Sequence, residues 1–153
     1  PQLEATFETI GRVAREAFGD ALPALICEPG RALCGDAFNL AARVKAVRDG
    51  THVFLNDGVY GSLFELSQIG IIDRIEVLDS DGRRRSGGVQ GRICFGPTCD
   101  SVDRLPGDVP FPADIAEGDF VIVHGMGAYS TVTNSRFNGF GELGMVTVLS
   151  LKL

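Results

Sequence analysis

The spacing of apolar residues changes part-way along the chain, and this change constrains the fold more than any other feature of the sequence. Apolar residues recur every three or four positions over 3–18 and at alternate positions over 38–46. The first spacing is typical of an amphipathic helix, which Gly19 would end, and the second is typical of a strand with one buried face. The sequence therefore predicts a helix followed by a β domain.

Twenty glycines and seven prolines separate further short β-branched runs, which favours a turn-rich β architecture over a helical bundle. Asp49-Gly50 is a strong hairpin signal, with 51–55 as the return strand. The proline-rich piece 106–112 is predicted to be an ordered surface loop anchored by Val109 and Phe111. Four more strand-like runs lie at 71–78, 89–95, 120–124 and 145–151. Together they predict a mainly β fold, an antiparallel β-sandwich or Greek-key barrel.

The segment between the helix and the β domain has the pattern of the end of an α/β unit. The run 24–27 is short and apolar, which predicts a buried strand, and Pro29-Gly30 would break it. Helix, strand and loop then follow one another in the order found in α/β folds. The apolar face of the helix also requires a partner surface. A domain boundary is expected within residues 32–37.

Charge and hydropathy argue against two classes of partner. The formal net charge of −6 disfavours a nucleic acid. The one basic cluster, Arg83-Arg84-Arg85, follows Asp81-Gly82 and is expected to solvate the tip of a hairpin. No apolar run approaches the length needed to span a bilayer. Neither a nucleic-acid nor a membrane partner is predicted.

The cysteines at 27, 34, 94 and 99 lack the paired spacing of zinc ligands, and only His52 and His124 are present to complete a site. No metal is therefore predicted. Reduced thiols in a cytoplasmic protein are expected, because nothing in the sequence marks the chain as secreted.

Residues 96–103, Gly-Pro-Thr-Cys-Asp-Ser-Val-Asp, place a thiol beside a carboxylate behind a rigid Gly-Pro turn. A thiol can move a proton, and a carboxylate can hold the cationic end of a substrate. This octapeptide resembles the cysteine loop of the ornithine decarboxylases, pyridoxal-phosphate enzymes of fold type III that are close to diaminopimelate decarboxylases and more distantly related to alanine racemases. The resemblance extends to Glu28-Pro29-Gly30-Arg31, Asn56 to Ser62, Gly127-Ala128-Tyr129 and Phe137-Asn138-Gly139-Phe140.

The resemblance implies two parts to the chain. Residues 1–35 would be the end of an alanine-racemase-like (β/α)8 barrel, with its last helix, last strand and Glu-Pro-Gly-Arg loop, and residues 36–153 would be the C-terminal β domain. The cofactor implied is pyridoxal 5'-phosphate, which the family anchors through a lysine near the start of a much longer polypeptide. Lys45 and Lys152 stand in no lysine motif of the family. The chain is therefore expected to be the C-terminal part of such an enzyme, inactive without the missing N-terminal barrel segment.

The resemblance assigns cofactor contacts to Glu28, Arg31 and Tyr129. Glu28 matches the carboxylate that faces the ring nitrogen of the cofactor and favours its protonation. Arg31 and Tyr129 match donors to the cofactor phosphate, and glycines 125 and 127 are expected to let the backbone come close to it. Taken singly, Glu28 also fits a residue that caps the following turn. Tyr129 also fits a ring in the core with a wet hydroxyl.

Three further roles follow from the resemblance. Cys99 matches the residue that protonates the α-carbon after carbon dioxide leaves, Asp100 the carboxylate that receives the distal ammonium, and Phe137 an aromatic that lines the substrate pocket. The family loop projects into the active site of the partner subunit, which implies a homodimer with shared sites. From the residues alone, Cys99 also fits a small buried hydrophobe, Asp100 a turn cap and Phe137 a core residue.

One departure from the family affects the substrate. Eukaryotic-type members carry a Tyr-Asp pair whose carboxylate helps bind the terminal amine, and this chain has Ser67 and Gln68 there. A neutral amide removes one of the two negative charges that would pair with an ammonium group. The resemblance thus implies decarboxylation of a basic amino acid, such as ornithine to putrescine in polyamine biosynthesis. Related activities on lysine, diaminopimelate or carboxynorspermidine-type substrates remain alternatives.

Two hypotheses of other classes stay open. One is a non-catalytic homologue that regulates a true decarboxylase by forming a mixed dimer. The lack of the lysine fits this hypothesis, whereas the retention of Cys99, Asp100 and the cofactor-facing residues fits it poorly. The other is a piece left by proteolysis, which would expose the apolar face of its first helix.

Overall fold

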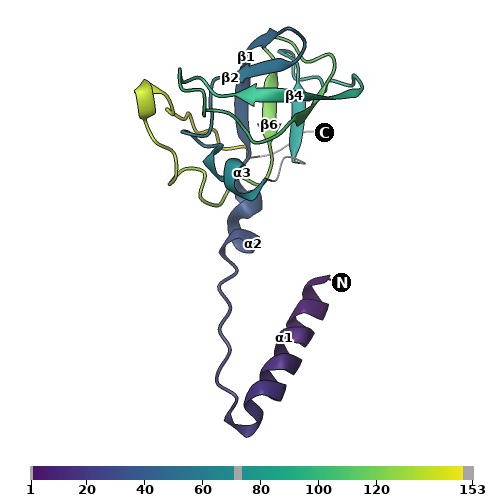
Figure 1. Ribbon diagram of the computed structural model, residues 1–153, viewed down its shortest axis with the longest axis vertical. Coiled ribbons are helices and arrows are strands. Elements are labelled where there is room, and N and C mark those ends of the chain that lie inside the picture. Colours follow the sequence, from purple (N-terminus) through teal and green to yellow (C-terminus); the bar gives the residue numbers. More distant parts are fainter. Residues whose placement is uncertain (1, 71–73, 150–153) are drawn as a thin grey trace.

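The computed structural model describes residues 2–70 and 74–149. A helix, α1 (Gln2–Phe18), stands away from a β domain, and an extended connection over residues 22–29 joins the two (Figure 1). The predicted helix is thereby confirmed, and Gly19 at its end has a φ of 51°. Among the described residues no helix is both long enough and apolar enough to cross a membrane.

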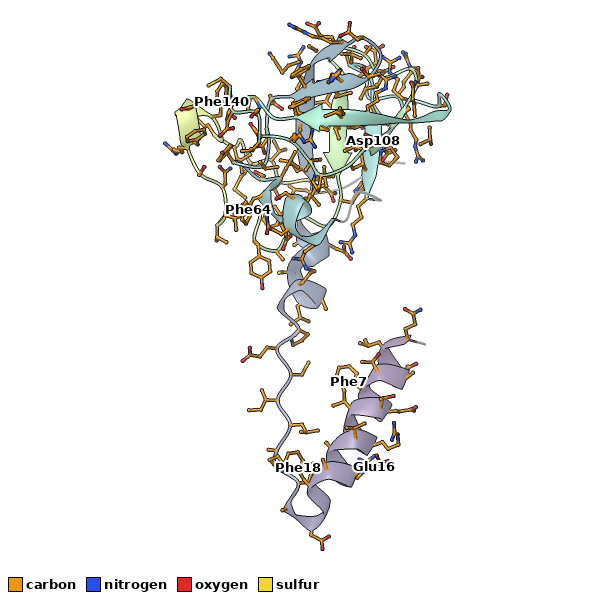
Figure 2. The ribbon with its side chains drawn as sticks, in the orientation of Figure 1. Phe7, Glu16, Phe18, Phe64, Asp108 and Phe140 are labelled. Atoms are coloured by element: carbon orange, nitrogen blue, oxygen red, sulfur yellow. The ribbon has the colours of Figure 1, made fainter. Side chains whose placement is uncertain are left out.

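Helix α1 is amphipathic but carries no buried residue. Phe7 and Phe18 project from the side of α1 that is turned toward the extended connection, and both are about half exposed (Figure 2). Local contacts support the helix on its polar side, where Arg12 pairs with Glu16 one turn later. The apolar stripe of α1 therefore packs against no element of the β domain.

Residues 24–27 form no strand in the structure. They lie in the extended connection and are exposed. This differs from the prediction because a strand exists only where a neighbouring backbone supplies hydrogen bonds, and apolar composition alone supplies none.

The β domain is built on one six-stranded sheet in the order β3-β6-β1-β2-β4-β5. The pair β2–β4 is parallel, and the other four pairs are antiparallel. The sheet curls into a nearly closed barrel, which confirms the predicted mainly β and mostly antiparallel fold (Figure 1). The strands are β1 (Leu40–Arg48), β2 (His52–Leu55), β3 (Ile75–Leu78), β4 (Val89–Phe95), β5 (Val109–Pro112) and β6 (Phe120–Val123).

Short helical segments lie before, between and after these strands. The α-helices are α2 (Gly30–Cys34) and α3 (Phe64–Ile69), and the 3-10 turns cover Gly19–Ala21, Gly35–Ala37 and Phe137–Gly139. Phe64 of α3 lies at the end of the β domain that continues into α2 (Figure 2). The two helices therefore approach each other at the entrance to the domain.

The β1–β2 hairpin is confirmed. Asp49 and Gly50 have φ values of 53° and 65°. Two successive left-handed residues fit the right-handed twist of the strands that they join, and Asp-Gly takes this conformation at low cost. The inward side of β1 holds Ala42 and Val44, both 1% exposed.

The runs 89–95 and 120–124 also form strands, β4 and β6. The run 71–78 forms β3 over its second half, and its residues 71–73 lie outside the described residues. Residues 145–149 have no regular secondary structure and are exposed, and 150–151 lie outside the described residues. The predicted last strand is therefore not formed over the part of 145–151 that the structure describes.

The proline-rich piece 106–112 is a strand over its second half and not a loop throughout. Val109 and Phe111, the expected anchors, are both 0% exposed and belong to β5. β5 lies at the edge of the sheet and pairs with β4 alone among the described strands. Prolines lack the N–H donor that an inner strand needs, so the edge is the place where they are tolerated.

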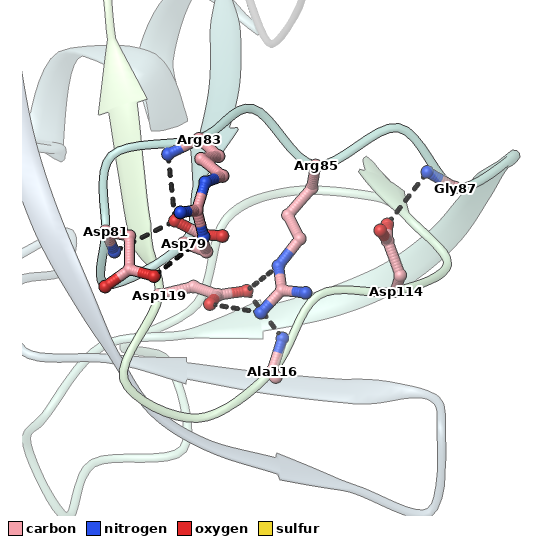
Figure 3. Close-up of polar contacts among 8 residues, drawn as sticks. All are labelled: Asp79, Asp81, Arg83, Arg85, Gly87, Asp114, Ala116 and Asp119. Carbon is pink, nitrogen blue, oxygen red and sulfur yellow. Dashed lines mark hydrogen bonds and ion pairs between the residues drawn. The ribbon is translucent and has the colours of Figure 1, made fainter.

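The basic cluster does more than solvate a hairpin tip, and the prediction was wrong for one of its members. Arg85 donates from Nε and Nη2 to the two carboxylate oxygens of Asp119, at 2.9 and 2.8 Å (Figure 3). Asp119 is only 2% exposed and also accepts from the N–H of Ala116. Arg83, in contrast, pairs with exposed Asp81 at the tip. Arg85 thus fastens the 79–85 turn to the start of β6.

Candidate cofactor and substrate site

Arg31 lies in the first turn of α2 and points to α3. Its guanidinium Nη2 donates to Oε1 of Glu65, whose side chain is largely buried. This hydrogen bond raises the pKa of Arg31 further above its ordinary value. A guanidinium has five N–H donors, so the contact with Glu65 orients Arg31 without using all of them.

Tyr129 lies beside Arg31. The Cζ atom of Arg31 is 5.5 Å from the centre of the tyrosine ring, a cation–π distance. Tyr129 has a φ of 64° and is 57% exposed. The interpretation of Tyr129 as a core ring is therefore wrong, and the phenol faces solvent next to a cation.

A close backbone approach explains how Tyr129 reaches α2. The N–H of Gly127 donates to the carbonyl of Gly35 at 2.8 Å. A Cβ atom at position 127 would lie 1.7 Å from the carbonyl oxygen of Cys34. Only glycine fits there, because the clash would be with backbone that cannot turn aside. Within this structure Gly127 serves contact between two protein segments.

Glu28 is not gathered to this pair by any described contact. It lies at the end of the extended connection and is exposed, and its carbonyl accepts from the N–H of Gly30 at 2.9 Å. It lies three positions before Arg31, across the turn at Pro29 that begins α2. The structure thus brings Arg31 and Tyr129 into contact. Glu28 lies just before Arg31 in the chain, and no described side-chain contact joins it to either residue.

The loop that carries Cys99 and Asp100 is shaped by Asp103. This carboxylate is 1% exposed, and it accepts from the N–H of Val59 and from both the N–H and the hydroxyl of Thr98. A Cβ atom at Gly96 would lie 2.3 Å from a carboxylate oxygen of Asp103. The Gly-Pro turn is thus wrapped around a buried acid, which pushes residues 99–100 outward.

Asp100 faces Tyr60. The tyrosine hydroxyl donates to Oδ2 of Asp100 at 2.6 Å, and the N–H of Val102 donates to Oδ1 at 3.0 Å. The hydrogen bond from Tyr60 holds the pKa of Asp100 below its usual range. The expected turn-capping contact is therefore present, together with a side-chain contact that extends beyond the loop.

Phe137 completes this cluster. Its ring centre is 4.4 Å from that of Tyr60, and it is 40% exposed. Phe137 therefore packs on the surface and not in the core. Cys99 is exposed as well, which excludes the alternative of a small buried hydrophobe for the described chain.

A tight turn positions Tyr60. Asp57 accepts from the N–H groups of Gly58 and Ser62, and burial raises its pKa. A Cβ atom at Gly61 would lie 1.8 Å from Oδ1 of Asp57. Tyr60 stands on this turn, and Glu65 follows it on α3. The short segment 57–65 therefore supports both Glu65, which binds Arg31, and Tyr60, which binds Asp100.

Sequence reasoning missed three residues that the structure places here: Tyr60, Glu65 and Asn138. Tyr60 stood inside a motif run without a role. Glu65 carried no signal, since its partner Arg31 is 34 positions away. Asn138 also stood inside a motif run and had no assigned role in the site, and in the structure its side chain reaches Cys99 from a backbone with a φ of 53°.

The arrangement supplies three chemical functions. Arg31 and Tyr129 offer hydrogen-bond donors of the kind that bind a phosphate group. Asp100 offers a carboxylate that stays ionised, and Cys99 an accessible thiol. Such a set fits an anionic cofactor and a substrate with a cationic end.

A protein-family model described as the pyridoxal-dependent decarboxylase C-terminal sheet domain matches residues 24–127. The chain belongs to this family. The match includes the Glu-Pro-Gly-Arg run, the whole cysteine loop and Gly127, and it ends two residues before Tyr129.

Relatives of this chain agree with the family model. Ornithine decarboxylase of Schizosaccharomyces pombe is 34% identical over 139 residues, which cover 84% of this chain and 32% of that protein. Antizyme inhibitor 2 of Xenopus laevis is 30% identical, with coverage of 89% and 34%. The crystal structure of the Paramecium bursaria Chlorella virus arginine decarboxylase superposes with a TM-score of 0.70 at 28% identity, with coverage of 88% and 36%. The chain spans about a third of the length of these proteins.

Proposed function

We propose that this chain is the C-terminal part of a pyridoxal-phosphate-dependent decarboxylase that acts on a basic amino acid. The observation that carries the proposal is the exposed thiol of Cys99 beside the half-buried carboxylate of Asp100, which accepts a hydrogen bond from Tyr60. A fold does not need an exposed thiol beside an ionised carboxylate, whereas a site for a diamino acid does. The remaining lysine-bearing barrel would be supplied by residues outside these 153.

We call Arg31, Tyr129, Glu65 and Glu28 the entrance cluster, because they lie where the extended connection enters the β domain. The donors and the carboxylates of this cluster are of the kinds that bind the cofactor. Arg31 and Tyr129 would hold its phosphate group, and Glu28 would face its ring nitrogen. When bound, pyridoxal phosphate supplies an electron sink for the charge left at the α-carbon when carbon dioxide departs. Glu65 would keep the guanidinium group of Arg31 oriented. The guanidinium N–H donors that do not bind Glu65 would face the phosphate.

The residues of the cysteine loop would act on the amino acid. Asp100 would bind the distal ammonium, because its carboxylate is kept ionised by the hydrogen bond from Tyr60. Cys99 would hand its proton to the α-carbon from which carbon dioxide has left. Phe137 would flank the aliphatic part of the substrate. In a homodimer with shared sites, the loop of one subunit would serve the cofactor of the other.

The substrate is proposed as a basic amino acid without a choice among ornithine, lysine and arginine. Gln68 lies in the last turn of α3 as an exposed amide that donates to the hydroxyl of Ser67 at 3.1 Å. It carries no charge to pair with a terminal amine. The named relatives include both an ornithine and an arginine decarboxylase, which supports the broader class. A cytoplasmic place in polyamine biosynthesis belongs to the same proposal.

The direct test is to express the complete coding region that contains these residues and to measure two properties. Visible absorption reports bound cofactor, and release of carbon dioxide from ornithine, lysine and arginine in parallel reports activity and preference. We expect a coloured protein that releases carbon dioxide from at least one of the three. A coloured protein inert toward all three would contradict the proposed substrate class.

Two substitutions assign the roles in the complete polypeptide. Cys99→Ala should divert products, because protonation at the α-carbon is impaired. Asp100→Ala should raise KM about tenfold or more with cofactor absorbance largely intact, because a hydrogen-bonded charge pair is lost. Ser101→Ala, an exposed neighbour, is the matched control and should change neither quantity. Unchanged product partition in Cys99→Ala would contradict its role.

A second candidate function is regulation of a true decarboxylase through a mixed dimer. The similarity to antizyme inhibitor 2 favours it. A regulator would copurify with a catalytic partner and show no cofactor absorption of its own. The same absorption measurement therefore separates the two functions.

A further inference from the structure

Asn138 adopts a backbone conformation that an L-residue rarely takes. Its φ and ψ are 53° and 23°, and Gly139 follows with a φ of 80°. Asparagine tolerates this left-handed region better than most residues, at a cost that the surrounding structure must offset. The turn aims the side chain of Asn138 away from its own segment.

The segment that carries Asn138 is fastened to Tyr60 at two points. The N–H and the hydroxyl of Ser135 both donate to the carbonyl of Tyr60, at 2.9 and 2.8 Å. The ring of Phe137 packs in a tilted contact against that of Tyr60. Since the hydroxyl of Tyr60 binds Asp100, one residue ties this segment and the cysteine loop together.

The result of this fastening is a contact between Asn138 and Cys99. The amide Nδ2 of Asn138 lies 3.6 Å from Sγ of Cys99, at hydrogen-bonding distance for sulfur. The two residues are 39 positions apart, so the contact depends on the whole arrangement around Tyr60. A side-chain amide is here a donor, because sulfur is the acceptor in this geometry.

We propose that Asn138 is a positioning residue for Cys99. The side-chain amide of Asn138 fixes the orientation of the Cys99 sulfur and stabilises its thiolate form. The inference rests on the proposed function for its catalytic meaning. When the S–H bond breaks and the proton forms a C–H bond at the α-carbon, the negative charge moves to sulfur. A donor to that charge favours the transfer.

Four charged or titratable residues lie on the elements that meet at the sulfur: Asp100, Asp103, Tyr60 and Arg136. Asp100 and Asp103 on the cysteine loop carry carboxylates that accept hydrogen bonds from other groups. Tyr60 donates to Asp100. Arg136, on the facing segment, is exposed. The amide of Asn138 is therefore the neutral donor that the structure directs at the sulfur.

The test measures alkylation of Cys99 by iodoacetamide as a function of pH, with site-resolved mass spectrometry. It needs neither cofactor nor substrate, so its failure is distinct from failure of the proposed function. Asn138→Gly removes the amide but suits the left-handed backbone. Asn138→Asp keeps the size and replaces the donor by a negative charge. Cys27, exposed and remote in sequence, is the internal reference.

Removing the amide should move the pH midpoint of Cys99 alkylation upward in Asn138→Gly and further upward in Asn138→Asp. At neutral pH the rate should fall about threefold in the glycine variant, as expected for one ordinary hydrogen bond. The rate at Cys27 should stay the same. In the complete enzyme, Asn138→Gly should also shift product partition in the direction of Cys99→Ala. An alkylation profile of Cys99 unchanged in both variants would overturn the proposal.

Discussion

The hydroxyl of Tyr60 donates a 2.6 Å hydrogen bond to Oδ2 of Asp100, across 40 positions of sequence. The contact lowers the pKa of Asp100 and raises that of Tyr60. It also joins the turn that leads to α3 with the cysteine loop. The charge and the orientation of the Asp100 carboxylate, the candidate substrate-binding group, thus depend on Tyr60, which lies outside the cysteine loop.

Tyr60→Phe should raise the pKa of Asp100 toward its ordinary value, because the donor that favours the ionised form is gone. The folded pKa of Asp100 is depressed, so the contact contributes stability above the unfolded pKa, about 4. That contribution is lost as the pH falls through the folded pKa. An NMR titration of the Asp100 carboxyl carbon measures the change. Tyr129→Phe is the control, and an equal change in both variants would contradict the contact.

Gly127→Ala should destabilise the β domain by about 2 kcal/mol, the usual cost of forcing an atom into a filled site. The new Cβ atom would lie 1.7 Å from the carbonyl oxygen of Cys34. A Cβ atom at Gly88 would meet only open space, and the φ of Gly88 is not left-handed. Gly88→Ala is therefore the matched control. Urea unfolding of both variants measures the difference. Equal stability of the two would show that the close approach to α2 is absent.

The fold was predictable from the sequence where the signal is local. The range 89–95 matches β4 because a short run with β-branched residues, bounded by glycines, reports a strand directly. The Asp49-Gly50 hairpin was predictable because the two residues set the turn by their own conformations. β5 was missed because its prolines indicate a loop unless the edge position is known. Residues 24–27 were apolar, but no local pattern reports whether a neighbouring strand is present.

Asp119→Ala should destabilise the protein by about 3 kcal/mol, because it removes a buried carboxylate that binds Arg85 through two hydrogen bonds (Figure 3). Asp81→Ala removes the carboxylate of an exposed pair with Arg83 in the same turn and should cost about 0.5 kcal/mol or less. Urea unfolding at neutral pH compares them. A loss in Asp81→Ala as large as that in Asp119→Ala would contradict the fastening role of Arg85.

Cys94 should resist alkylation at pH 8 while Cys99 reacts. Cys94 is 1% exposed, and burial raises the pKa of its thiol to about 12, so almost no thiolate is present. Cys99 is exposed. Mass spectrometry after a timed reaction should find Cys94 modified only once urea unfolds the β domain. Equal labelling of both thiols in the folded chain would contradict the burial of β4.

The residues of the candidate site could be predicted from the sequence only where they belong to a short motif. Cys99, Asp100 and Phe137 were named from runs of adjacent residues, and the structure gathers them. Their contacts with Tyr60 and Asn138 join segments about 40 positions apart, and no local pattern encodes such contacts. Glu28 also came from a motif, but the described structure gives its side chain no partner that would test its role.

The most direct test of the central claim is cofactor affinity at the entrance cluster in the complete polypeptide. Equilibrium dialysis against pyridoxal phosphate compares wild type, Arg31→Ala and Arg43→Ala. Both arginines stack over an aromatic ring, Arg31 over Tyr129 and Arg43 over Phe120. We predict that Arg31→Ala weakens cofactor binding about tenfold or more, since it loses charged hydrogen bonds to the phosphate, and that Arg43→Ala binds like wild type. Wild-type affinity in folded Arg31→Ala would contradict the account.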